Sequence, residues 1–288
     1  MPTITTKTKQ VWTILDIINW GKDYLTKHGI TNAKLELEWF LSDLLKCNRI
    51  DLYIRFEEQL HQLELDKIRK FITRRKTHEP FQYILKKAPF YGRDFIVNNS
   101  VLIPRPETET IIEIIKQKSE SGNFLDIGTG SGCIAISLLK EKIFSTGVAI
   151  DISRESLFIA NQNKLKFQIE NLEFKQLDFL NENINQTFNC IVSNPPYIPP
   201  EEMKSLKDGV IKFEPEIALT DFSDGLSFYR KIAIDGKKLL NPNGFIILET
   251  GGENQIIQVK QIFLDQNYIV IIHKDQNGEN RFLEITPK

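Results

Sequence analysis

The segment DIGTGSG, residues 126–132, lies between an apolar run typical of a buried strand and a stretch with helical periodicity. Glycines at such a strand-to-helix turn permit a tight turn and let a ligand approach the backbone closely. A dinucleotide fingerprint would require glycine where this chain has Cys133, and the Lys-Ser/Thr pair of a phosphate-binding P-loop is also missing. The segment therefore predicts a ligand-binding turn of an α/β fold, for which NAD is a poor match.

Strand-like and helix-like segments alternate along the rest of the chain. Strands are predicted at residues 124–127, 147–150, 172–177, 188–193, 244–249, 268–273 and 281–285. Helices are predicted between them, at about residues 132–140, 153–166, 226–240 and 253–266. This alternation favours an α/β fold with a mainly parallel sheet and helices on both faces. The turn at 275–278 is too short for a parallel crossover, so the last strand is expected to be antiparallel.

Side chains suited to binding a nucleoside follow three of these strands. Asp151 closes the second strand about 20 residues after the glycine segment, where a carboxylate can accept hydrogen bonds from both hydroxyls of a ribose. Asp178 and Phe179 follow the third strand, and Asn194 follows the fourth. Ligands of open α/β sheets bind at the carboxyl ends of the strands, so we expect these residues to converge on one cleft.

The fourth strand ends in the turn Asn194-Pro195-Pro196-Tyr197. Two consecutive prolines fix two φ angles and remove two backbone donors, which makes the turn stiff. The Asn194 side-chain oxygen and the Pro195 carbonyl are left as acceptors, and the Tyr197 ring offers a flat wall. A planar NH2 group, with two donors and a π face, fits this arrangement. A proline-rich loop that merely leaves a strand is the alternative, and the upstream glycines and carboxylates argue against it.

Residues 1–85 contain helical patterns and no strand-like segment. Apolar residues recur at helical spacing from Val11 to about Leu25, from an N-cap at Asn32 to Leu45, and from Leu65 to Lys76. We interpret this region as a small helical bundle that serves binding or positioning. The basic cluster at 69–76 is compatible with RNA or an acidic partner, although a solvated helix face is the favoured interpretation.

Residues 86–103 are predicted to form a β-hairpin that links two domains. Alternation at 90–97 predicts the first strand, residues 98–99 form a turn signal, and residues 101–103 resume a strand. The second domain, with the alternating strands and helices, is then expected to span residues 104–288.

Composition excludes several classes of protein. The 288-residue chain has a net charge of −1 and 41% apolar residues, which gives no general argument for nucleic-acid or membrane binding. Its three cysteines are far apart, and no CxxC pair or His/Cys cluster is present, so neither a disulfide framework nor a metal site is expected. No apolar run is long enough to span a bilayer, and we expect a cytoplasmic protein.

The motif order and the antiparallel last strand resemble class I S-adenosylmethionine-dependent methyltransferases, which have a seven-stranded, mostly parallel Rossmann-like sheet. The Asn-Pro-Pro-Tyr turn after the fourth strand resembles the branch that methylates amino or amide nitrogens. Four further segments narrow the match: PFQYI at 80–84, FYG at 90–92, VLIPRPETE at 101–109 and FEP at 213–215. With the helical N-terminal region, the chain looks like a member of the peptide chain release factor glutamine methyltransferase family (HemK/PrmC-like).

This resemblance implies a reaction, a cofactor, a partner and a set of site residues. The methyl donor would be S-adenosylmethionine, and the acceptor would be the Gln side-chain amide of the Gly-Gly-Gln motif in class I release factors. Gly128, Thr129, Gly130, Ser131 and Gly132 would pass under the methionine part of the cofactor, Asp151 would hold the ribose, and Asp178 and Phe179 would flank the adenine. Asn194, Pro195, Pro196 and Tyr197 would hold the Gln amide, and Asn194 would also adjoin the cofactor.

Other positions near the expected cleft are less defined. Arg105 and Glu107 are candidate substrate-binding residues, with a local ion pair or a helix start as an equally weighted alternative. Phe179 stands where related enzymes often have tryptophan. The phenylalanine ring keeps a π face but lacks the hydrogen-bond donor of the indole. Residues 198–224 have few periodic features and are interpreted as a recognition flap, in which Asp208 and Glu214 are candidates to meet basic residues near the substrate Gln.

Three other functions stay open. A DNA adenine N6-methyltransferase can use the same turn but has to flip a base, and this chain has no evident DNA-binding motif. A glutamine methyltransferase acting on a ribosomal protein would differ only in its substrate. A third alternative is a non-catalytic, nucleoside-binding adaptor of translation, and the intact Asn194 and Asp151 argue against it. We favour the release-factor substrate, without direct DNA or membrane contact, and expect a monomer.

Overall fold

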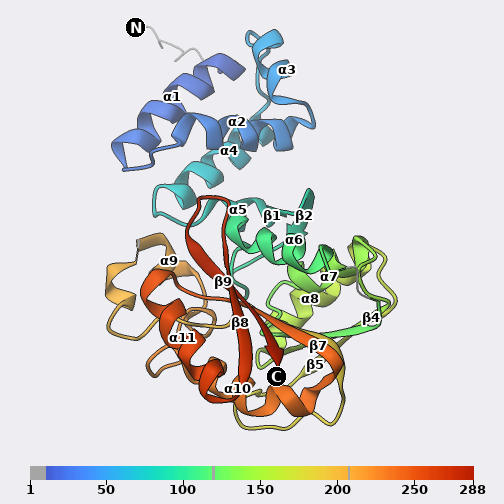
Figure 1. Cartoon of the computed structure of the whole chain (residues 1–288). Helices are drawn as coiled ribbons and strands as arrows, with labels where there is room; N and C mark the ends of the chain where they lie inside the picture. Colours follow the sequence, from blue (N-terminus) through green and yellow to red (C-terminus); the bar gives the residue numbers. More distant parts are fainter. Residues whose placement is uncertain (1–10, 119–120, 207) are drawn as a thin grey trace, which may run out of the picture. The chain divides into compact units, whose positions relative to one another are not determined.

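The computed structural model describes residues 11–118, 121–206 and 208–288, and the chain divides into two compact units (Figure 1). The smaller unit extends to Leu85 and is helical, whereas the larger unit begins at Lys86 and contains the sheet. The helices of the smaller unit are α1 (Ile14–Lys27), α2 (Ala33–Leu45), α3 (Arg49–Ile54), α4 (Gln62–Arg75) and α5 (Phe81–Leu85). The predicted N-terminal helical region is therefore confirmed.

Two features of these helices differ from the sequence-based expectation: an additional short helix and the cap of α2. Helix α3 has only 6 residues, which is less than two turns, so its apolar positions show no periodicity that could have predicted it. Asn32 does precede α2, but its side chain makes no capping hydrogen bond. Its φ of −98° and ψ of 27° lie outside the extended conformation in which an N-cap side chain reaches the first turn.

The basic cluster on α4 is largely neutralised within the smaller unit. The Arg69 guanidinium pairs with Asp66 at 2.9 Å, and Arg75 pairs with Glu36 of α2. The Arg69–Asp66 pair is exposed and adds little stability, whereas the side chains of the Arg75–Glu36 pair are only 14% and 12% exposed. Arg69 therefore fits the interpretation of a solvated helix face, whereas Arg75 packs within the smaller unit.

The larger unit is built on a seven-stranded sheet with the order β5-β4-β3-β6-β7-β9-β8. Its strands are β3 (Asn123–Ile127), β4 (Thr146–Asp151), β5 (Leu172–Gln176), β6 (Phe188–Ser193), β7 (Leu240–Glu249), β8 (Tyr268–Lys274) and β9 (Asn280–Pro287). The first five strands in this order, from β5 through β4, β3 and β6 to β7, pair in parallel with their neighbours. Strand β9 is antiparallel to both of its neighbours, β7 and β8. The predicted sheet with its antiparallel last strand is confirmed, and β9 is found inserted between β7 and β8.

Helices cover both faces of this sheet and bury two separate cores. These helices are α6 (Thr110–Lys116), α7 (Cys133–Lys140), α8 (Arg154–Lys166), α10 (Ser227–Leu239) and α11 (Glu253–Asp265). Successive strand residues point to opposite faces. Phe124 thus joins the core under α6 and α7, whereas its neighbour Leu125 joins the core under α10 and α11. Because both faces are buried, the central strands are continuous apolar runs in the sequence.

A hairpin exists within the predicted range 86–103, but its strands and its turn were misplaced. Strand β1 (Lys87–Phe90) pairs with β2 (Arg93–Ile96), and the turn between them is Tyr91-Gly92. Both turn residues have positive φ, 47° and 71°, which is typical of two-residue hairpin turns. Residues 101–103, expected to be the second strand, belong to no strand. The alternation at 90–97 therefore spans a turn.

The hairpin packs within the larger unit. Phe90 and Phe95 belong to the core under α6 and α7. Asn163 of α8 accepts a hydrogen bond from the Ile96 N–H at 2.7 Å and donates one to the Ile96 carbonyl at 2.9 Å. These two bonds join the edge of β2 to a helix of the sheet domain.

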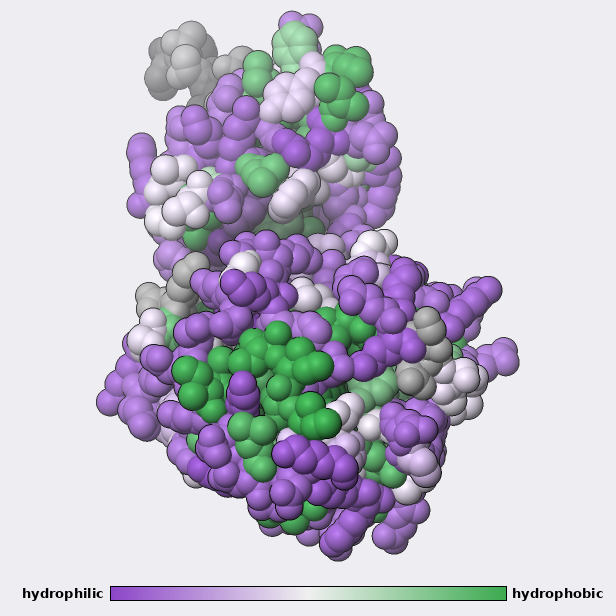
Figure 2. Space-filling view, viewed as in Figure 1, coloured by the Kyte–Doolittle hydropathy of each residue, from purple (hydrophilic) through white to green (hydrophobic). Residues whose placement is uncertain are grey.

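A hydrophobic patch lies over α11 and the β8–β9 hairpin (Figure 2). Ile257 of α11 and Ile269 and Ile271 of β8 are 61%, 48% and 49% exposed. Strand β8 forms one edge of the sheet, and its outward apolar side chains are about half exposed among the described residues. None of the three residues lines the cavities of the candidate site.

The segment expected to be a flap contains three short helical turns. They are η2 (Met203–Ser205), α9 (Asp208–Phe213) and η3 (Glu216–Ala218). Each is too short to show periodicity, which explains the prediction of a loop. The side chain of Asp208, for which a basic partner was considered, lies outside what the structure describes.

The strand order places a topological switch point in the middle of the sheet. From β3 the chain moves to β4 and β5 on one side, and then returns to β6 on the other side of β3. A crevice forms at the carboxyl ends of strands where connections diverge in this way, and ligands of α/β folds bind there. The glycine segment follows β3 and Asn194 follows β6, so both lie at this point.

Candidate active site

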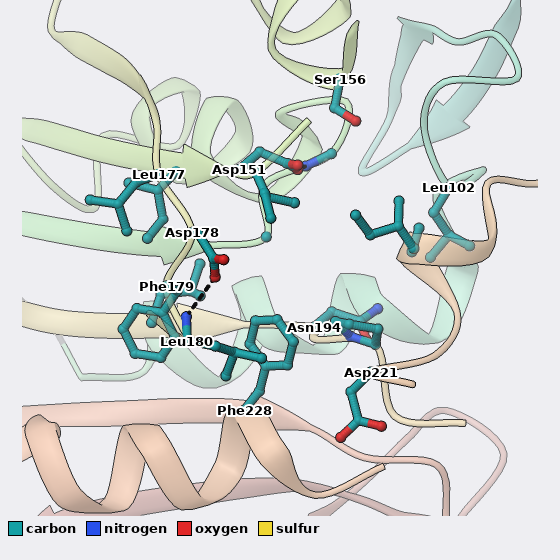
Figure 3. A pocket seen from close by; sticks show the side chains of 18 of the residues that line it. Leu102, Asp151, Ser156, Leu177, Asp178, Phe179, Leu180, Asn194, Asp221 and Phe228 are labelled. Carbon is teal, nitrogen blue, oxygen red and sulfur yellow. Dashed lines mark hydrogen bonds between the residues drawn. The ribbon is translucent and has the colours of Figure 1, made fainter. Parts of the chain in front are cut away.

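A cavity of about 1040 Å³, with its open mouth included, lies at the switch point (Figure 3). Its walls come from the ends of β3, β4 and β6, from the loop after β5, and from residues 217–228. The four motifs expected to converge on one cleft all contribute to its lining.

The glycine segment forms one side of the cavity through two of its residues. Gly128 and Gly130 line the cavity with φ of 73° and 55°, and an added Cβ at either position would meet no atom within 4 Å. Gly132 differs, since a Cβ there would press on Ile136, Phe174 and Ala160. The first two glycines therefore leave room for a ligand, whereas the third permits close packing at the start of α7.

Thr129 and Ser131 support the glycine segment from behind and do not line the cavity. Both side chains are buried, and the Thr129 hydroxyl donates to Asp126 at 2.7 Å. Burial raises the pKa of Asp126 to about 7, and this hydrogen bond opposes the rise. Three of the five positions predicted to underlie the ligand, Thr129, Ser131 and Gly132, therefore shape the turn.

Asp151 joins the glycine segment to the end of β4. One carboxylate oxygen accepts a hydrogen bond from the Gly130 N–H, and the other accepts one from the Ser153 N–H, each at 2.9 Å. Burial raises the pKa of Asp151, and the two backbone hydrogen bonds oppose this rise. Each oxygen keeps further acceptor capacity toward the cavity, so the carboxylate can receive a pair of hydroxyls.

Asp178 and Phe179 form the wall beyond β5 (Figure 3). The Asp178 carboxylate accepts hydrogen bonds from the Leu180 N–H at 3.1 Å and the Asn181 amide at 2.8 Å, which fold the loop. The Phe179 ring stacks on Phe228 of α10, with 6.3 Å between centroids and 15° between planes. Phe228 was not anticipated, because no local motif indicates which residue of a helix start faces a cavity.

Residues 217–228 close the opposite side of the cavity. Asp221 lines the cavity and accepts hydrogen bonds at 2.9 Å from the N–H groups of Ser223, Gly225 and Ser227. Burial raises the pKa of Asp221, but its hydrogen bonds from Ser227, Ser223 and Gly225 outweigh this and lower it. A carboxylate that stays ionised thus holds the loop in one shape beside the mouth of the cavity.

The Asn-Pro-Pro-Tyr turn separates this cavity from a second one. Asn194 lines both cavities, Pro196 lines the first, and Pro195 and Tyr197 line the second. The Asn194 side-chain N–H donates to the Thr108 hydroxyl at 3.3 Å. The stiff turn is therefore a shared wall, with one polar side chain that can reach molecules on both sides.

Comparison with known proteins agrees with this arrangement. Residues 16–85 match the PrmC N-terminal domain, and residues 106–211 match the methyltransferase small domain. A release factor glutamine methyltransferase of Geobacter sulfurreducens is 39% identical over 85% of this chain and 87% of its own length. One from Bacillus subtilis is 37% identical over 93% of this chain and 96% of its own length. This chain belongs to the release factor glutamine methyltransferase family.

A longer relative and a solved structure are also similar to this chain. A bifunctional methyltransferase of Rickettsia bellii is 38% identical over 96% of this chain, which spans only 55% of that relative. A solved methyltransferase from Pyrococcus furiosus shares the fold, with a TM-score of 0.52 at 20% identity, over 78% of this chain and 98% of its own. The Rossmann-like methyltransferase fold is thus confirmed.

An ion pair lies beside the second cavity of this family member. Arg105 lines it and donates to the Glu214 carboxylate at 2.7 Å. The Glu214 side chain is 1% exposed and also accepts a hydrogen bond from the Ile103 N–H at 3.4 Å. The local ion pair considered for Arg105 is present. Glu107 lies in the short turn η1 (Pro106–Glu109) and lines neither cavity, so its helix-start interpretation fits better.

Tyr197 is fixed by residues that the sequence did not indicate. Its carbonyl accepts a hydrogen bond at 2.8 Å from the side-chain amide of Gln255 on α11, which also donates to the Gly225 carbonyl. Burial raises the pKa of the Tyr197 hydroxyl to about 12. The ring therefore stays neutral and is held at the boundary between the second cavity and a groove beside α11.

The described part of the chain contains neither a cluster suited to a metal ion nor a helix suited to a membrane. No group of three His, Cys, Asp or Glu side chains there has the arrangement of a metal site. No helix among the described residues is long and apolar enough to cross a membrane.

Proposed function

We propose that this chain transfers the methyl group of S-adenosylmethionine to the side-chain amide nitrogen of the Gln in the Gly-Gly-Gln motif of class I release factors. The observation that carries the proposal is the position of the Asn-Pro-Pro-Tyr turn between two cavities. A group-transfer enzyme needs two adjoining sites, one for the donor and one for the acceptor. Membership of the family supports the choice of acceptor.

The first cavity fits the methyl donor. Gly128 and Gly130 leave open space where a side chain would stand, which suits the amino-acid part of the molecule. Asp151 offers two carboxylate oxygens to a pair of ribose hydroxyls, and Phe179 offers a ring face to a flat base. When bound, S-adenosylmethionine supplies a methyl group on a sulfonium, which is open to attack by a nucleophile.

The protein must overcome the poor nucleophilicity of an amide nitrogen. Its lone pair is delocalised into the carbonyl, so orientation matters more than proton removal before transfer. The Asn194 side-chain oxygen and the Pro195 carbonyl accept the two N–H groups of the substrate amide, and Tyr197 packs on its plane. This holds the nitrogen lone pair toward the first cavity and opposes delocalisation. Positioning and fixed dipoles then provide most of the rate enhancement.

Proton transfer needs no dedicated base in this scheme. Once the nitrogen has four substituents it is strongly acidic, so one N–H proton leaves to water after the C–N bond has formed. Tyr197 is not the base, since burial raises the pKa of its hydroxyl to about 12 and keeps it protonated. No residue of the turn changes its protonation state during the reaction.

The partner and setting of the reaction follow from the substrate. We assign contact with the Gly-Gly-Gln segment to those residues of the 198–219 segment that line the second cavity, and we assign further contacts with the release factor to the helical unit. The net charge of −1 offers no general attraction to DNA. The protein would act as a monomer in the cytoplasm, where release factors function.

The test is to incubate the protein with isotopically labelled S-adenosylmethionine and a release factor, and to locate the label by mass spectrometry. The expected result is one methyl group on the Gln of Gly-Gly-Gln, and none on a release factor with Gln→Ala at that position. Label on DNA or on a ribosomal protein instead would overturn the substrate. Cofactor binding without any transfer would overturn the activity and favour an adaptor.

A further inference from the structure

Asn163 of α8 is fully buried and contacts two segments that are far apart in the sequence. Its side-chain NH2 group donates one hydrogen bond to the Ser131 carbonyl of the glycine segment and one to the Ile96 carbonyl of β2, each at 2.9 Å. Its side-chain oxygen accepts a hydrogen bond from the Ile96 N–H at 2.7 Å. Both amide hydrogens and the amide oxygen are therefore committed to the backbone of these two segments.

Asparagine is an unfavourable residue for the buried side of a helix. It stabilises a helix less than alanine or leucine, because its side chain competes with the backbone for hydrogen bonds. A buried amide also costs free energy unless its groups are paired. The amide of Asn161 bonds to the Leu157 carbonyl within α8, whereas the three partners of Asn163 all lie outside the helix. The task of Asn163 is therefore to join other segments, and not to support α8.

The glycine segment is held by different partners in its two halves. The backbone N–H groups of residues 128–130 donate to the Ile150 carbonyl and to the Asp151 carboxylate at the end of β4, at 2.9 to 3.0 Å. Ser131, in the second half, is held from α8 by Asn163. A shift of Ser131 would move the glycine that precedes it, which lines the first cavity. Asn163 thus fixes a part of the turn that the end of β4 does not hold.

The same side of α8 also holds the segment around β2. The Ser156 hydroxyl donates to the Ser100 carbonyl at 2.8 Å, and Ser156 lines the first cavity. The Lys166 ammonium donates to the Asp94 carbonyl. These two side chains lie seven residues before Asn163 and three residues after it, so the three share one side of the helix. The hairpin and the cofactor turn are therefore attached to one regular element.

We propose that Asn163 is a positioning residue for the cofactor, which fixes the Ser131 carbonyl against the β1–β2 hairpin and thereby sets the shape of the turn that receives the methyl donor. The inference rests on the proposed function, because it takes the first cavity as the site of S-adenosylmethionine. Asn163 is not among the residues that line this cavity, so it acts through Ser131. Loss of Asn163 weakens cofactor binding, and a bound cofactor in turn stabilises the bonds of Asn163 to Ile96, because such coupling is reciprocal.

The matched control is a second asparagine, Asn189 of β6. Its side-chain oxygen accepts hydrogen bonds from the Asn123 N–H at 3.1 Å and from the Asn241 amide at 3.2 Å. It therefore also joins separate segments, but at the amino end of the sheet, whereas the first cavity lies at the carboxyl end. Asn163→Ala and Asn189→Ala each remove such a link, and we expect both to lower the melting temperature by about 4–10 °C.

The two variants should differ in cofactor affinity. We expect Asn163→Ala to raise the dissociation constant of S-adenosylhomocysteine, the product form of the cofactor, by about tenfold or more, in calorimetry at a temperature at which both variants are folded. Asn189→Ala should keep it within about twofold, and Asn161→Ala on the same helix should leave both affinity and melting temperature unchanged. No loss of affinity in Asn163→Ala, or a loss of the same size in Asn189→Ala, would overturn the positioning role.

A second measurement uses the unchanged protein and keeps the inference testable if Asn163→Ala does not fold. Hydrogen exchange of the Ile96 N–H, which bonds to Asn163, is followed by NMR with and without S-adenosylhomocysteine. The bound cofactor should slow this exchange more than that of the Asn123 N–H, which bonds to Asn189. Equal slowing at both positions would reflect only general stabilisation by the ligand, and it would overturn the link between the cofactor turn and the hairpin.

The outcomes separate this inference from the proposed function. No binding of S-adenosylhomocysteine to the unchanged protein would overturn the proposed function itself. Binding that is equally strong in the unchanged protein and in Asn163→Ala would overturn only the positioning role. Binding that is weakened in Asn163→Ala alone, with no methyl group transferred to a release factor by the unchanged protein, would support the positioning role and overturn the proposed substrate.

Discussion

The cavity lined by Gly130 and the cavity lined by Arg105 share Asn194, yet they are built from different kinds of segment. The first is surrounded by residues that follow parallel strands at the switch point. The second lies between the turn, residues before η1 and short helical turns of the 198–219 segment. A sheet can hold a cofactor site of general shape, whereas irregular segments adapt the adjoining site to one substrate.

The largest effect is expected at the wall that the two cavities share. Asn194→Ala removes the acceptor proposed for the substrate amide and should reduce turnover by about a thousandfold or more, as when a preorganised transition-state contact is lost. Affinity for S-adenosylmethionine should largely survive, because Asp151 and the glycine segment are unchanged. Single-turnover methylation and calorimetry of cofactor binding measure the two quantities. Turnover near that of the unchanged protein would refute the mechanism.

The difference between the two cavities also explains what the sequence could predict. Asp151, Asp178 and Asn194 end or follow consecutive parallel strands, and topology alone brings such positions to one edge of the sheet. Alternation and strand-end chemistry were therefore enough for the sheet and for those walls of the first cavity that follow its strands. The hairpin turn at Tyr91-Gly92 was misplaced because a two-residue turn hardly interrupts an alternating pattern.

The residues that sequence reasoning missed share a different property. Phe228 stacks on Phe179, Gln255 holds the Tyr197 carbonyl, and Thr108 contacts Asn194. Each belongs to a helix or helical turn far from its partner in the sequence. Their roles depend on which side of a helix faces the site after packing, and no local pattern contains that information. Thr108 was within a quoted motif but had no role until its contact with Asn194 was visible.

The second prediction concerns the first cavity alone. Gly130→Ala puts a methyl group into open space that the cofactor is proposed to fill, and should weaken cofactor binding by about tenfold or more. Gly92→Ala is the matched control, since Gly92 has φ of 71°, has no atom within 4 Å of an added Cβ, and lies in the β1–β2 turn.

Both variants carry a similar backbone cost of about 1 kcal/mol, because alanine tolerates positive φ poorly. Thermal unfolding should therefore shift similarly in Gly130→Ala and Gly92→Ala. Calorimetry should find weaker S-adenosylmethionine binding only in Gly130→Ala. Weakening of the same size in both would mean that strain, and not occupation of the cavity, decides affinity.

The smallest expected effect is on the second cavity. Arg105→Gln removes the cation from Glu214, whose side chain is 1% exposed, and should raise KM for the release factor by about tenfold as the wall around residues 198–219 loosens. The free energy of unfolding should fall by about 1–3 kcal/mol, because a buried carboxylate loses its partner while Arg105 itself is 35% exposed. Affinity for S-adenosylmethionine should not change, since Arg105 does not line the first cavity.

The control for Arg105→Gln is Arg69→Gln, which breaks an exposed pair in the smaller unit, with side chains 72% and 44% exposed. Its unfolding free energy should change by less than about 0.5 kcal/mol. Arg105→Gln combined with Glu214→Gln should recover part of the lost stability, because no uncompensated charge is then buried. A fall in cofactor affinity as large as the rise in KM for the release factor would show that the two cavities are one site. The distinction between a general cofactor wall and an adapted substrate wall would then fail.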